Sequence, residues 1–257
     1  MRDPGLSEAI EAVGGVSELA KRIGISQPSV SNWNKVPADR VLAVEAATGV
    51  ARMRLRPDLY REQQAVAVDD IDLARSREYA LLSSLLAGAP SAELLTRLAR
   101  LGGDASPLGL AHMALGEAAS SLKSNAIERE YFDLFIGLGR GELLPYASYY
   151  IAGFLNERPL ARLRDDLAAF GVERVEGNYE PEDHAATLCE IMAAFSGGRF
   201  QAPEGAERRL FEKHMAPWMM RFFSDLERAE AANFYRHVGT LGRIFMTIEA
   251  EAFALPG

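Results

Sequence analysis

The apolar residues of this 257-residue chain recur with the spacing of an α-helix from one end to the other. Near the N-terminus, Val16, Leu19, Ala20 and Ile23 follow the i, i+3, i+4, i+7 pattern that places side chains on one helix face. Four later stretches repeat this spacing: 127–135, 188–195, 215–226 and 234–252. No sustained run alternates between apolar and polar residues, as a half-buried strand would. We therefore predict an all-α fold.

Charge divides the chain into two parts. Residues 1–60 carry eight Lys and Arg against seven Asp and Glu, a net charge of +1, whereas the rest carries twenty against twenty-nine, a net of −9. A near-neutral part with locally gathered basic residues can meet DNA phosphates, whereas a strongly acidic part favours cationic partners. Because the segment 61–71 begins without a clear apolar stripe, we predict a linker there, between domains at 1–60 and 72–257.

Cysteine content and hydropathy narrow the class of protein. The single cysteine, Cys189, excludes an internal disulfide and a four-thiolate metal site, and this usage suits a reducing cytoplasm. The first residues lack the apolar run of a signal peptide, and no stretch of about 18 apolar residues occurs. We expect a soluble cytoplasmic protein that is not exported and does not enter a membrane.

The segment VSELAKRIGISQPSVSNWNK (16–35) predicts two short helices joined by a tight turn. The first helix, over 17–23, ends at Gly24, whose freedom at positive φ suits a helix stop. Ser26 then caps the second helix, with Gln27 and Pro28 in its first turn. Together with VPADRVLAVEAATG, this segment resembles the helix-turn-helix of Cro/YdaS-like regulators, and the resemblance covers about residues 5–60.

That resemblance implies a DNA-binding module whose second helix lies in the major groove. Gln and Asn can pair bidentately with adenine, and Ser is less selective. Four residues are candidate base contacts: Gln27, Ser29, Ser31 and Asn32. Five are candidate phosphate contacts: Lys35, Arg40, Arg52, Arg54 and Arg56. The alternative is a helical module that has the same scaffold but contacts another protein, since a net charge of +1 is low for a DNA-binding domain.

The segment Glu180-Pro181-Glu182-Asp183-His184 places three carboxylates and an imidazole within five residues. By itself it predicts a helix N-terminus, with Pro181 and two carboxylates in the first turn, where the macrodipole favours negative charge. A metal site has little support because Cys189 and His184 are five residues apart and point to different helix faces. Acid–base catalysis would need a cleft that no spacing shows, so a metal-dependent hydrolase is the weakest alternative.

Four separated blocks, in the right order, resemble the TorD family of cytoplasmic chaperones over about residues 72–250. The blocks contain Tyr131, Leu134 and Phe135; Pro145, Ser148 and Tyr149; Glu180, Pro181, Asp183 and His184; and His214 and Trp218. Members of this family are all-helical, are not enzymes, and escort molybdenum-containing redox enzymes during cofactor insertion. Many bind the enzyme's twin-arginine leader. The resemblance implies that these blocks shape a client-binding surface and that the chain uses no cofactor or metal of its own.

A twin-arginine leader carries two guanidinium groups followed by an apolar segment, so its receptor needs carboxylates beside an apolar groove. We predict that Glu180 and Asp183 line or shape this surface, that Pro181 fixes the loop, and that His184 stands between loop and helix. Six residues are candidates for the apolar groove, and a place in the core is the alternative for each: Tyr146, Tyr149, Tyr150, Phe154, Trp218 and Met219.

Two functional classes follow. In the first, the chain is a chaperone whose partner is a molybdoenzyme catalytic subunit or its leader peptide. The sequence around 140–164 most resembles the branch of this family associated with formate dehydrogenase. In the second, it is a transcriptional regulator whose helical C-terminal domain senses a ligand or client. A helix-turn-helix module predicts a homodimer on paired half-sites, whereas TorD-like proteins occur as monomers or as dimers that exchange halves.

Overall fold

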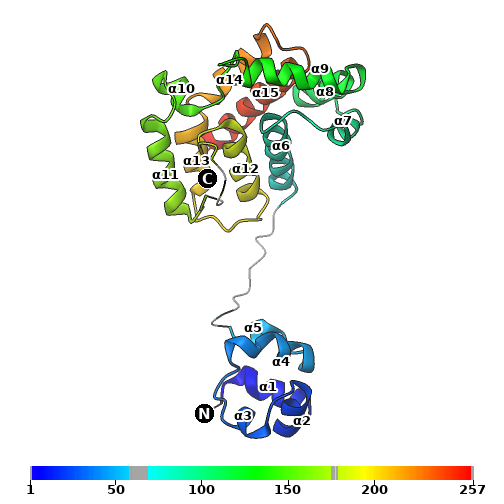
Figure 1. Ribbon diagram of the computed structural model, residues 1–257, viewed down its shortest axis with the longest axis vertical. Coiled ribbons are helices and arrows are strands. Elements are labelled where there is room, and N and C mark those ends of the chain that lie inside the picture. The colour runs from blue at the N-terminus through cyan, green and yellow to red at the C-terminus, as the bar shows by residue number, and fades with distance from the viewer. Residues whose placement is uncertain (1, 58, 60–68, 175–176, 178, 256–257) are drawn as a thin grey trace. The chain divides into compact units, whose positions relative to one another are not determined.

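The computed structural model describes residues 2–57, 59, 69–174, 177 and 179–255. It forms two compact units, Met1–Val66 and Ala67–Gly257 (Figure 1). Within the described residues every regular element is a helix, which confirms the all-α prediction. The predicted linker at 61–71 falls largely outside the described residues.

The N-terminal unit is a small helical fold around its own apolar core. Its elements are α1 (Pro4–Ala12), α2 (Val16–Arg22), α3 (Gln27–Ser31), the 3-10 turn η1 (Ala38–Arg40), α4 (Val41–Thr48) and α5 (Arg52–Leu55). Fully buried Leu6, Leu19, Val30, Val41 and Leu55 form the centre of that core. Each of the five helices therefore contributes at least one side chain to a single cluster.

The predicted turn between the first two helices of the 16–35 segment is confirmed in detail. Gly24 follows α2 with φ +70°, in the left-handed region that glycine reaches without steric cost. Ser26 is the N-cap residue of α3, and Gln27 and Pro28 open the helix as predicted. The Ser26 hydroxyl, however, lies 2.7 Å from the Ser29 hydroxyl and makes no capping bond to a backbone amide. The helix therefore starts at the predicted place without the predicted cap.

The C-terminal unit contains the remaining helices. They are α6 (Asp70–Leu86), α7 (Ala92–Leu98), α8 (Pro107–Ser121), α9 (Ser124–Tyr131), the π-helical segment η2 (Phe132–Ile136), α10 (Ala147–Ala152), α11 (Arg158–Phe170), α12 (Ala185–Ser196), α13 (Ala206–Leu210), the π-helical segment η3 (Phe211–Met215), α14 (Met219–Arg228) and α15 (Phe234–Ala254). No helix in the described part of the chain is long and apolar enough to cross a membrane.

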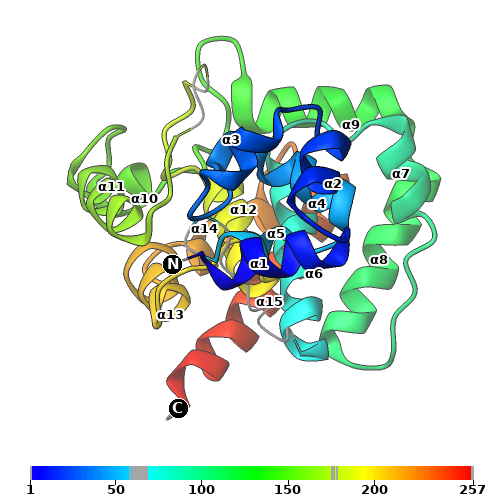
Figure 2. The ribbon, with the colours of Figure 1, turned by 90° about the horizontal axis from the view of Figure 1, so that it is seen from below.

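The long helices α6, α12, α14 and α15 build the core of this unit. α6 packs along α12, and α15 packs against α14 and α8. Figures 1 and 2 show α10 and α11 on one side of the unit and α7 and α8 on the opposite side. Fully buried Tyr79, Leu188, Met192, Phe222 and Leu241 lie in one continuous apolar cluster. The side formed by α11 and α12 is where the candidate site lies.

Two glycines allow α15 to approach α14 closely. A Cβ atom at Gly239 would lie 2.5 Å from the backbone nitrogen of Glu227, and one at Gly242 would lie 2.3 Å from the ring of Phe223. Both distances are shorter than a carbon atom can tolerate, so the contact between the two helices requires glycine at these positions. The apolar stripe predicted over 234–252 therefore includes a close helix–helix contact that its spacing did not indicate.

The prediction for the start of the helix after Glu180 was wrong by several residues. α12 begins at Ala185, and His184 is its N-cap residue. Pro181, Glu182 and Asp183 precede the helix in a turn closed by a hydrogen bond from the His184 N–H to the Pro181 carbonyl, 3.1 Å. The carboxylates are therefore not first-turn residues that complement the macrodipole. The turn is held instead by hydrogen bonds to residues 145–148.

Candidate functional site

The turn before α12 is bonded to the segment just before α10. The Ala185 N–H donates to the Pro145 carbonyl at 2.8 Å, and the Ala147 N–H donates to the Asp183 carbonyl at 3.0 Å. The Asp183 carboxylate accepts a third bond, from the Ser148 N–H, at 2.8 Å. Two of the blocks singled out in the sequence thus form one structure, which we call the clasp and define as residues 145–148 with 183–185.

His184 caps α12 from inside the clasp. Its Nδ1 accepts a hydrogen bond from the Ala186 N–H at 3.0 Å, which leaves the ring proton on Nε2. The ring meets that of Tyr146 edge to face, with centroids 4.9 Å apart. Burial lowers the pKa of His184, and the nearby charges of Glu180 and Asp183 oppose that shift without overcoming it. His184 is therefore a neutral structural cap rather than a proton donor at the surface.

Tyr146 connects the clasp to Glu180. Its hydroxyl donates to Glu180 Oε1 at 2.5 Å. Burial is the main cause that raises the pKa of Tyr146, and the Glu180 carboxylate adds to it, so the phenol stays protonated and acts as a donor. The side chain of Glu180 itself is exposed. The clasp therefore presents one carboxylate at the surface in a defined orientation.

The predicted client-binding residues divide by burial into two groups. Six are buried and cannot touch a ligand in this conformation: Pro145, Ser148, Asp183, His184, His214 and Trp218. Five are half-buried or exposed: Tyr131, Phe135, Tyr149, Glu180 and Pro181. Burial thus separates residues that can shape a surface from those that can line one.

The blocks around Tyr131 and Trp218 lie in two aromatic groups of the C-terminal unit. The Tyr131 ring centroid is 5.1 Å from that of Phe135 and 5.8 Å from that of Tyr235. The Trp218 ring is 5.4 Å from Tyr150, and its indole N–H donates to the His214 carbonyl at 2.7 Å. Trp218 and His214 are therefore parts of the core, which was the alternative left open for the aromatic residues.

His214 anchors α11 to the C-terminal helices. Its Nε2 lies 2.8 Å from Asp166 Oδ2, and Arg209 also pairs with this carboxylate. Asp166 is buried and faces α13 and η3, although Arg162 stands one helical turn before it on α11.

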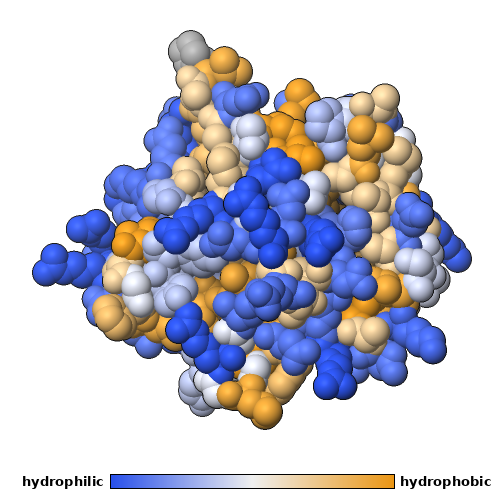
Figure 3. Space-filling model, turned by 90° about the horizontal axis from the view of Figure 1, so that it is seen from above, coloured by the Kyte–Doolittle hydropathy of each residue, from blue (hydrophilic) through white to orange (hydrophobic). Residues whose placement is uncertain are grey.

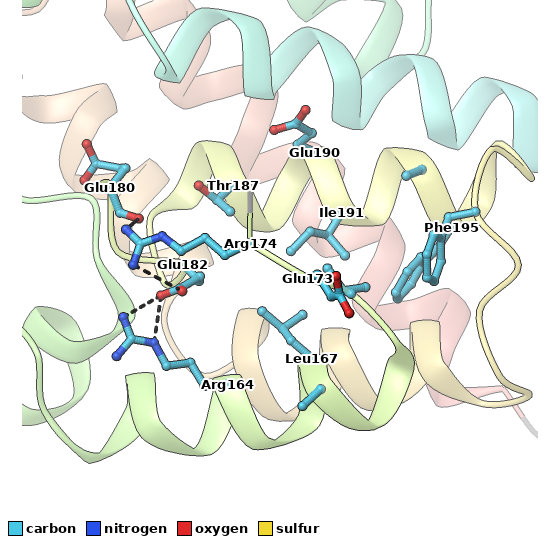
Figure 4. Close-up of a pocket in the computed structure, with 14 residues that line it drawn as sticks. Arg164, Leu167, Glu173, Arg174, Glu180, Glu182, Thr187, Glu190, Ile191 and Phe195 are labelled. Atoms are coloured by element: carbon cyan, nitrogen blue, oxygen red, sulfur yellow. Dashed lines mark hydrogen bonds and ion pairs between the residues drawn. The ribbon is translucent and has the colours of Figure 1, made fainter. Parts of the chain in front are cut away.

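A pocket of about 320 Å³ opens next to the clasp, between α11, α12 and the segments that contain Glu173 and Glu182. Its floor is apolar and is formed by Leu167, Ala168, Val172, Ile191, Ala194, Phe195 and Phe200. Four carboxylates lie on its rim: Glu173, Glu180, Glu182 and Glu190. Figure 4 shows these carboxylates around the apolar side chains of α11 and α12. The pocket thus combines four carboxylates and two arginines with an apolar surface, and Glu180 is the one predicted client-binding residue among those that line it.

Two arginines hold one of the rim carboxylates. Arg164 Nε and a terminal nitrogen of Arg164 lie 2.9 and 2.8 Å from Glu182 Oε2, and Arg174 lies 3.7 Å from Oε1 (Figure 4). Arg174 also donates to the Glu180 carbonyl at 3.0 Å. Partial burial works against the charge of Glu182, but the bonds from Arg164 outweigh it and hold the pKa of Glu182 below its ordinary value.

Sequence reasoning missed most of this pocket. Glu182 stood inside the segment that was singled out, but no role was assigned to it, and Arg164, Arg174, Glu190 and Phe200 were not considered. The apolar stripe predicted over 188–195, which includes Ile191 and Phe195, was the signal for part of the floor. Nothing in the spacing indicated that α11 and α12 would face each other across a pocket, because this depends on the packing of helices that are distant in sequence.

The candidate DNA-binding residues lie mainly on the surface of the N-terminal unit. Gln27, Ser29 and Asn32 are exposed on and just after α3. Ser31 is half-buried, and its hydroxyl accepts a bond from the Gln27 side-chain amide at 2.8 Å. This bond leaves the Gln27 amide oxygen, its second N–H and the Ser31 hydroxyl hydrogen available for a base.

The candidate phosphate contacts are mostly engaged within the unit. Arg40 is exposed and pairs with Asp39 at 3.1 Å, and Lys35 is also exposed. Arg52 and Arg54 pair with Glu45 and Glu8 at 2.8 and 3.1 Å. The prediction for Arg56 was wrong: this side chain is buried and donates to the Val36 carbonyl at 2.6 Å, so it stabilises the fold.

The described residues contain no group of three or more His, Cys, Asp or Glu side chains arranged to hold a metal ion. The clasp and the pocket likewise join carboxylates, aromatic rings and backbone groups through hydrogen bonds, with no exposed nucleophile activated by a base among these contacts.

Comparison with known proteins identifies both units. Residues 101–224 match the sequence model of the family described as nitrate reductase delta subunit, and residues 6–64 match that of the bacterial toxin YdaS. The structure defines a two-unit, all-helical protein. The C-terminal unit is TorD-like and similar to the nitrate reductase delta subunit family, and the N-terminal unit is YdaS-like.

Individual relatives agree with this assignment. The chaperone protein TorD of Vibrio cholerae (strain ATCC 39541) is 29% identical over 126 residues, which are 46% of this chain and 57% of that protein. The chain thus spans little more than half the length of that relative. TorD of Aliivibrio fischeri is 26% identical over 207 residues, 70% of this chain and 94% of that protein. YdaS of Escherichia coli K12, named as a candidate transcriptional regulator, is 43% identical over 58 residues, 20% of this chain and 59% of that protein.

One solved structure is also similar. A candidate redox enzyme maturation protein from Archaeoglobus fulgidus aligns with a TM-score of 0.45 and 21% identity, over 68% of this chain and 93% of that one. A TM-score below 0.5 does not define a common fold. The all-α class of this protein therefore follows from its own helices.

Proposed function

We propose that this protein is a cytoplasmic chaperone that binds an immature molybdenum-containing redox enzyme, or its twin-arginine leader, and assists cofactor insertion without making or breaking covalent bonds. The observation that carries the proposal is the pocket beside the clasp, where four carboxylates surround an apolar floor. Guanidinium groups bind carboxylates bidentately, and an apolar side chain that follows them would enter the pocket. The TorD relatives support the same function.

In this function the buried residues of the clasp hold the turn in its shape. The Ser148 N–H donates to the Asp183 carboxylate, and the Pro145 carbonyl accepts a bond from the turn. Tyr146 orients Glu180. Glu180, Glu182 and Glu190 then supply the charge, while Leu167, Ile191 and Phe195 supply the apolar contact. Apolar patches elsewhere on the surface, interrupted by hydrophilic side chains in Figure 3, are available to the folded part of a client.

Calorimetry with a synthetic peptide, containing two adjacent arginines followed by an apolar segment, tests the proposal. We expect the wild-type chain to bind it, and Ile191→Ala to weaken binding about fivefold to tenfold because apolar contact on the pocket floor is lost. Ile151→Ala is the matched control, since Ile151 is exposed on α10 and lies outside this pocket. Equal affinity for a peptide of scrambled sequence would refute leader recognition.

The identity of the client is a separate part of the proposal. The resemblance around 140–164 favours a formate dehydrogenase. Affinity capture with the full chain as bait, from anaerobically grown cells, should retrieve a molybdoenzyme catalytic subunit. Mass spectrometry of the captured protein identifies the client. Capture of a different molybdoenzyme would support the chaperone function but would show that formate dehydrogenase is not the client.

We propose DNA binding by the YdaS-like unit as a second function, because Gln27, Ser29 and Asn32 are exposed on and just after α3. In this alternative the chain is a regulator whose C-terminal unit senses a client. A gel-shift with genomic fragments tests it. We expect Gln27→Ala with Asn32→Ala to abolish sequence preference while leaving weak, salt-sensitive binding. Retention of full sequence preference in this variant would show that other residues read the bases.

A further inference from the structure

The pocket rim carries guanidinium groups that belong to the chain itself. Arg164 comes from α11 and Arg174 from the segment after it, and both reach the carboxylate of Glu182. Glu182 is the innermost partner of this cluster, with 15% of its side chain exposed, whereas Arg164 and Arg174 are 49% and 38% exposed. Two cations with access to water therefore converge on one sheltered anion at the mouth of an apolar pocket.

This geometry matches what the proposed ligand would bring. An arginine binds a carboxylate through two parallel N–H···O contacts, and Arg164 places two of its nitrogens, at 2.9 and 2.8 Å, on a single Glu182 oxygen. The other oxygen lies 3.7 Å from a terminal nitrogen of Arg174. A guanidinium group of a bound peptide could replace both chain arginines, with its next apolar side chain directed to Leu167 and Ile191.

We propose that Glu182 is a guanidinium-binding subsite that Arg164 and Arg174 occupy in the ligand-free protein, and that an arginine of the client displaces them. The inference rests on the proposed binding of a twin-arginine leader and adds the position of one arginine together with its built-in competitors. Arg164 and Arg174 are partly exposed, so water competes for their side of the ion pair, and an incoming guanidinium group can exchange with them.

The subsite also predicts a preference for arginine over lysine. A guanidinium group offers planar, paired donors that can reproduce both contacts of Arg164, whereas an ammonium group is a compact point charge. A lysine in the ligand would therefore have to compete against two arginines with a poorer geometry. Arg164 and Arg174 therefore give way only to a cationic side chain whose donors match the carboxylate of Glu182.

Arg164→Gln provides the decisive measurement, because glutamine keeps a polar side chain and removes the competing charge. With the full chain and the twin-arginine peptide, we expect the Kd of this variant to fall about threefold to tenfold below that of the wild type. Glu182→Gln should raise the Kd at least about tenfold, since the anchor for the guanidinium group is lost. A peptide with two lysines should bind more weakly than the arginine peptide to the wild type.

Arg162→Gln is the matched control, since Arg162 stands two residues earlier on α11 and lines a different pocket. Its Kd should equal that of the wild type. Arg174→Gln is a second test of the same idea, in case Arg164→Gln fails to fold by circular dichroism, and it should lower the Kd by a smaller factor because its contact is longer.

The outcomes separate the inference from the proposed function. If the wild type binds the peptide and both arginine variants bind it equally well or less well, the arginines are struts of the fold, and the inference is wrong while the function stands. If neither wild type nor variants bind any twin-arginine peptide, the proposed function fails as well. Tighter binding by Arg162→Gln would mean that loss of any positive charge on α11 strengthens peptide binding, and this would also overturn the subsite.

Discussion

The imidazole of His184 shows how burial sets the role of a single residue. The ring accepts the Ala186 N–H, packs against Tyr146, and has two carboxylates nearby that would favour its protonation. Burial outweighs these charges and lowers the pKa of the ring. The sequence placed His184 between loop and helix, and the structure uses it there as a buried cap of α12. Its role there depends on solvent access, which residue order alone does not specify.

The pH dependence of stability follows from the lowered pKa. The unfolded imidazole titrates near about 6.5, so below that pH the unfolded chain takes up a proton that folded His184 resists. We expect the stability that His184 contributes to be present above about pH 6.5 and lost as pH falls. Urea unfolding of wild type and His184→Asn, at several pH values, measures it. Their difference should shrink on acidification, and a constant difference would contradict the prediction.

Helix ends in this protein are often completed by residues from distant segments. Asn233 precedes α15 without capping it through its side chain, and the carboxylate of Glu130 instead accepts the N–H groups of Asn233, Phe234 and Tyr235 at 2.8, 3.0 and 2.6 Å. Glu130 lies on α9, about a hundred residues earlier, and is buried. The clasp does the same for α12. Capping therefore joins helices that sequence patterns treat as independent.

Glu130→Gln should lower the free energy of unfolding by about 1–3 kcal/mol, because a charged acceptor of three backbone bonds becomes a neutral amide with one acceptor oxygen. Glu128→Gln is the matched control, since Glu128 is exposed two residues earlier on the same helix. Urea unfolding curves followed by circular dichroism measure both. An equal loss in the two variants would mean that the cap of α15 is not supplied by Glu130.

The whole molecule consists of two units, each with its own core. Leu6, Leu19 and Val41 belong to one apolar cluster, whereas Tyr79, Leu188 and Phe222 belong to the other. The predicted boundaries near residues 60 and 72 stay a prediction, because most of the segment between them lies outside the described residues. Separate cores mean that each unit can bury its apolar surface without the other.

Residues 69–257 expressed alone should therefore fold and bind the twin-arginine peptide with the affinity of the full chain. Residues 1–60 expressed alone should fold as a small helical domain and retain whatever DNA binding the full chain has. Circular dichroism, calorimetry and gel-shift measure the three properties. A fragment 69–257 that folds but loses peptide affinity would show that the N-terminal unit contributes to the binding site.

Local sequence pattern determined the helical class, the turn at Gly24 and the starts of several helices, because each depends on residues within a few positions of one another. Of the residues in the family blocks, Glu180 lines the pocket. Only the tertiary structure decided that 145–148 meets 183–185, that Asp166 pairs with His214, and that Glu182 is held by Arg164. These contacts join helices far apart in the chain, and helical periodicity specifies which face is buried but not which partner covers it.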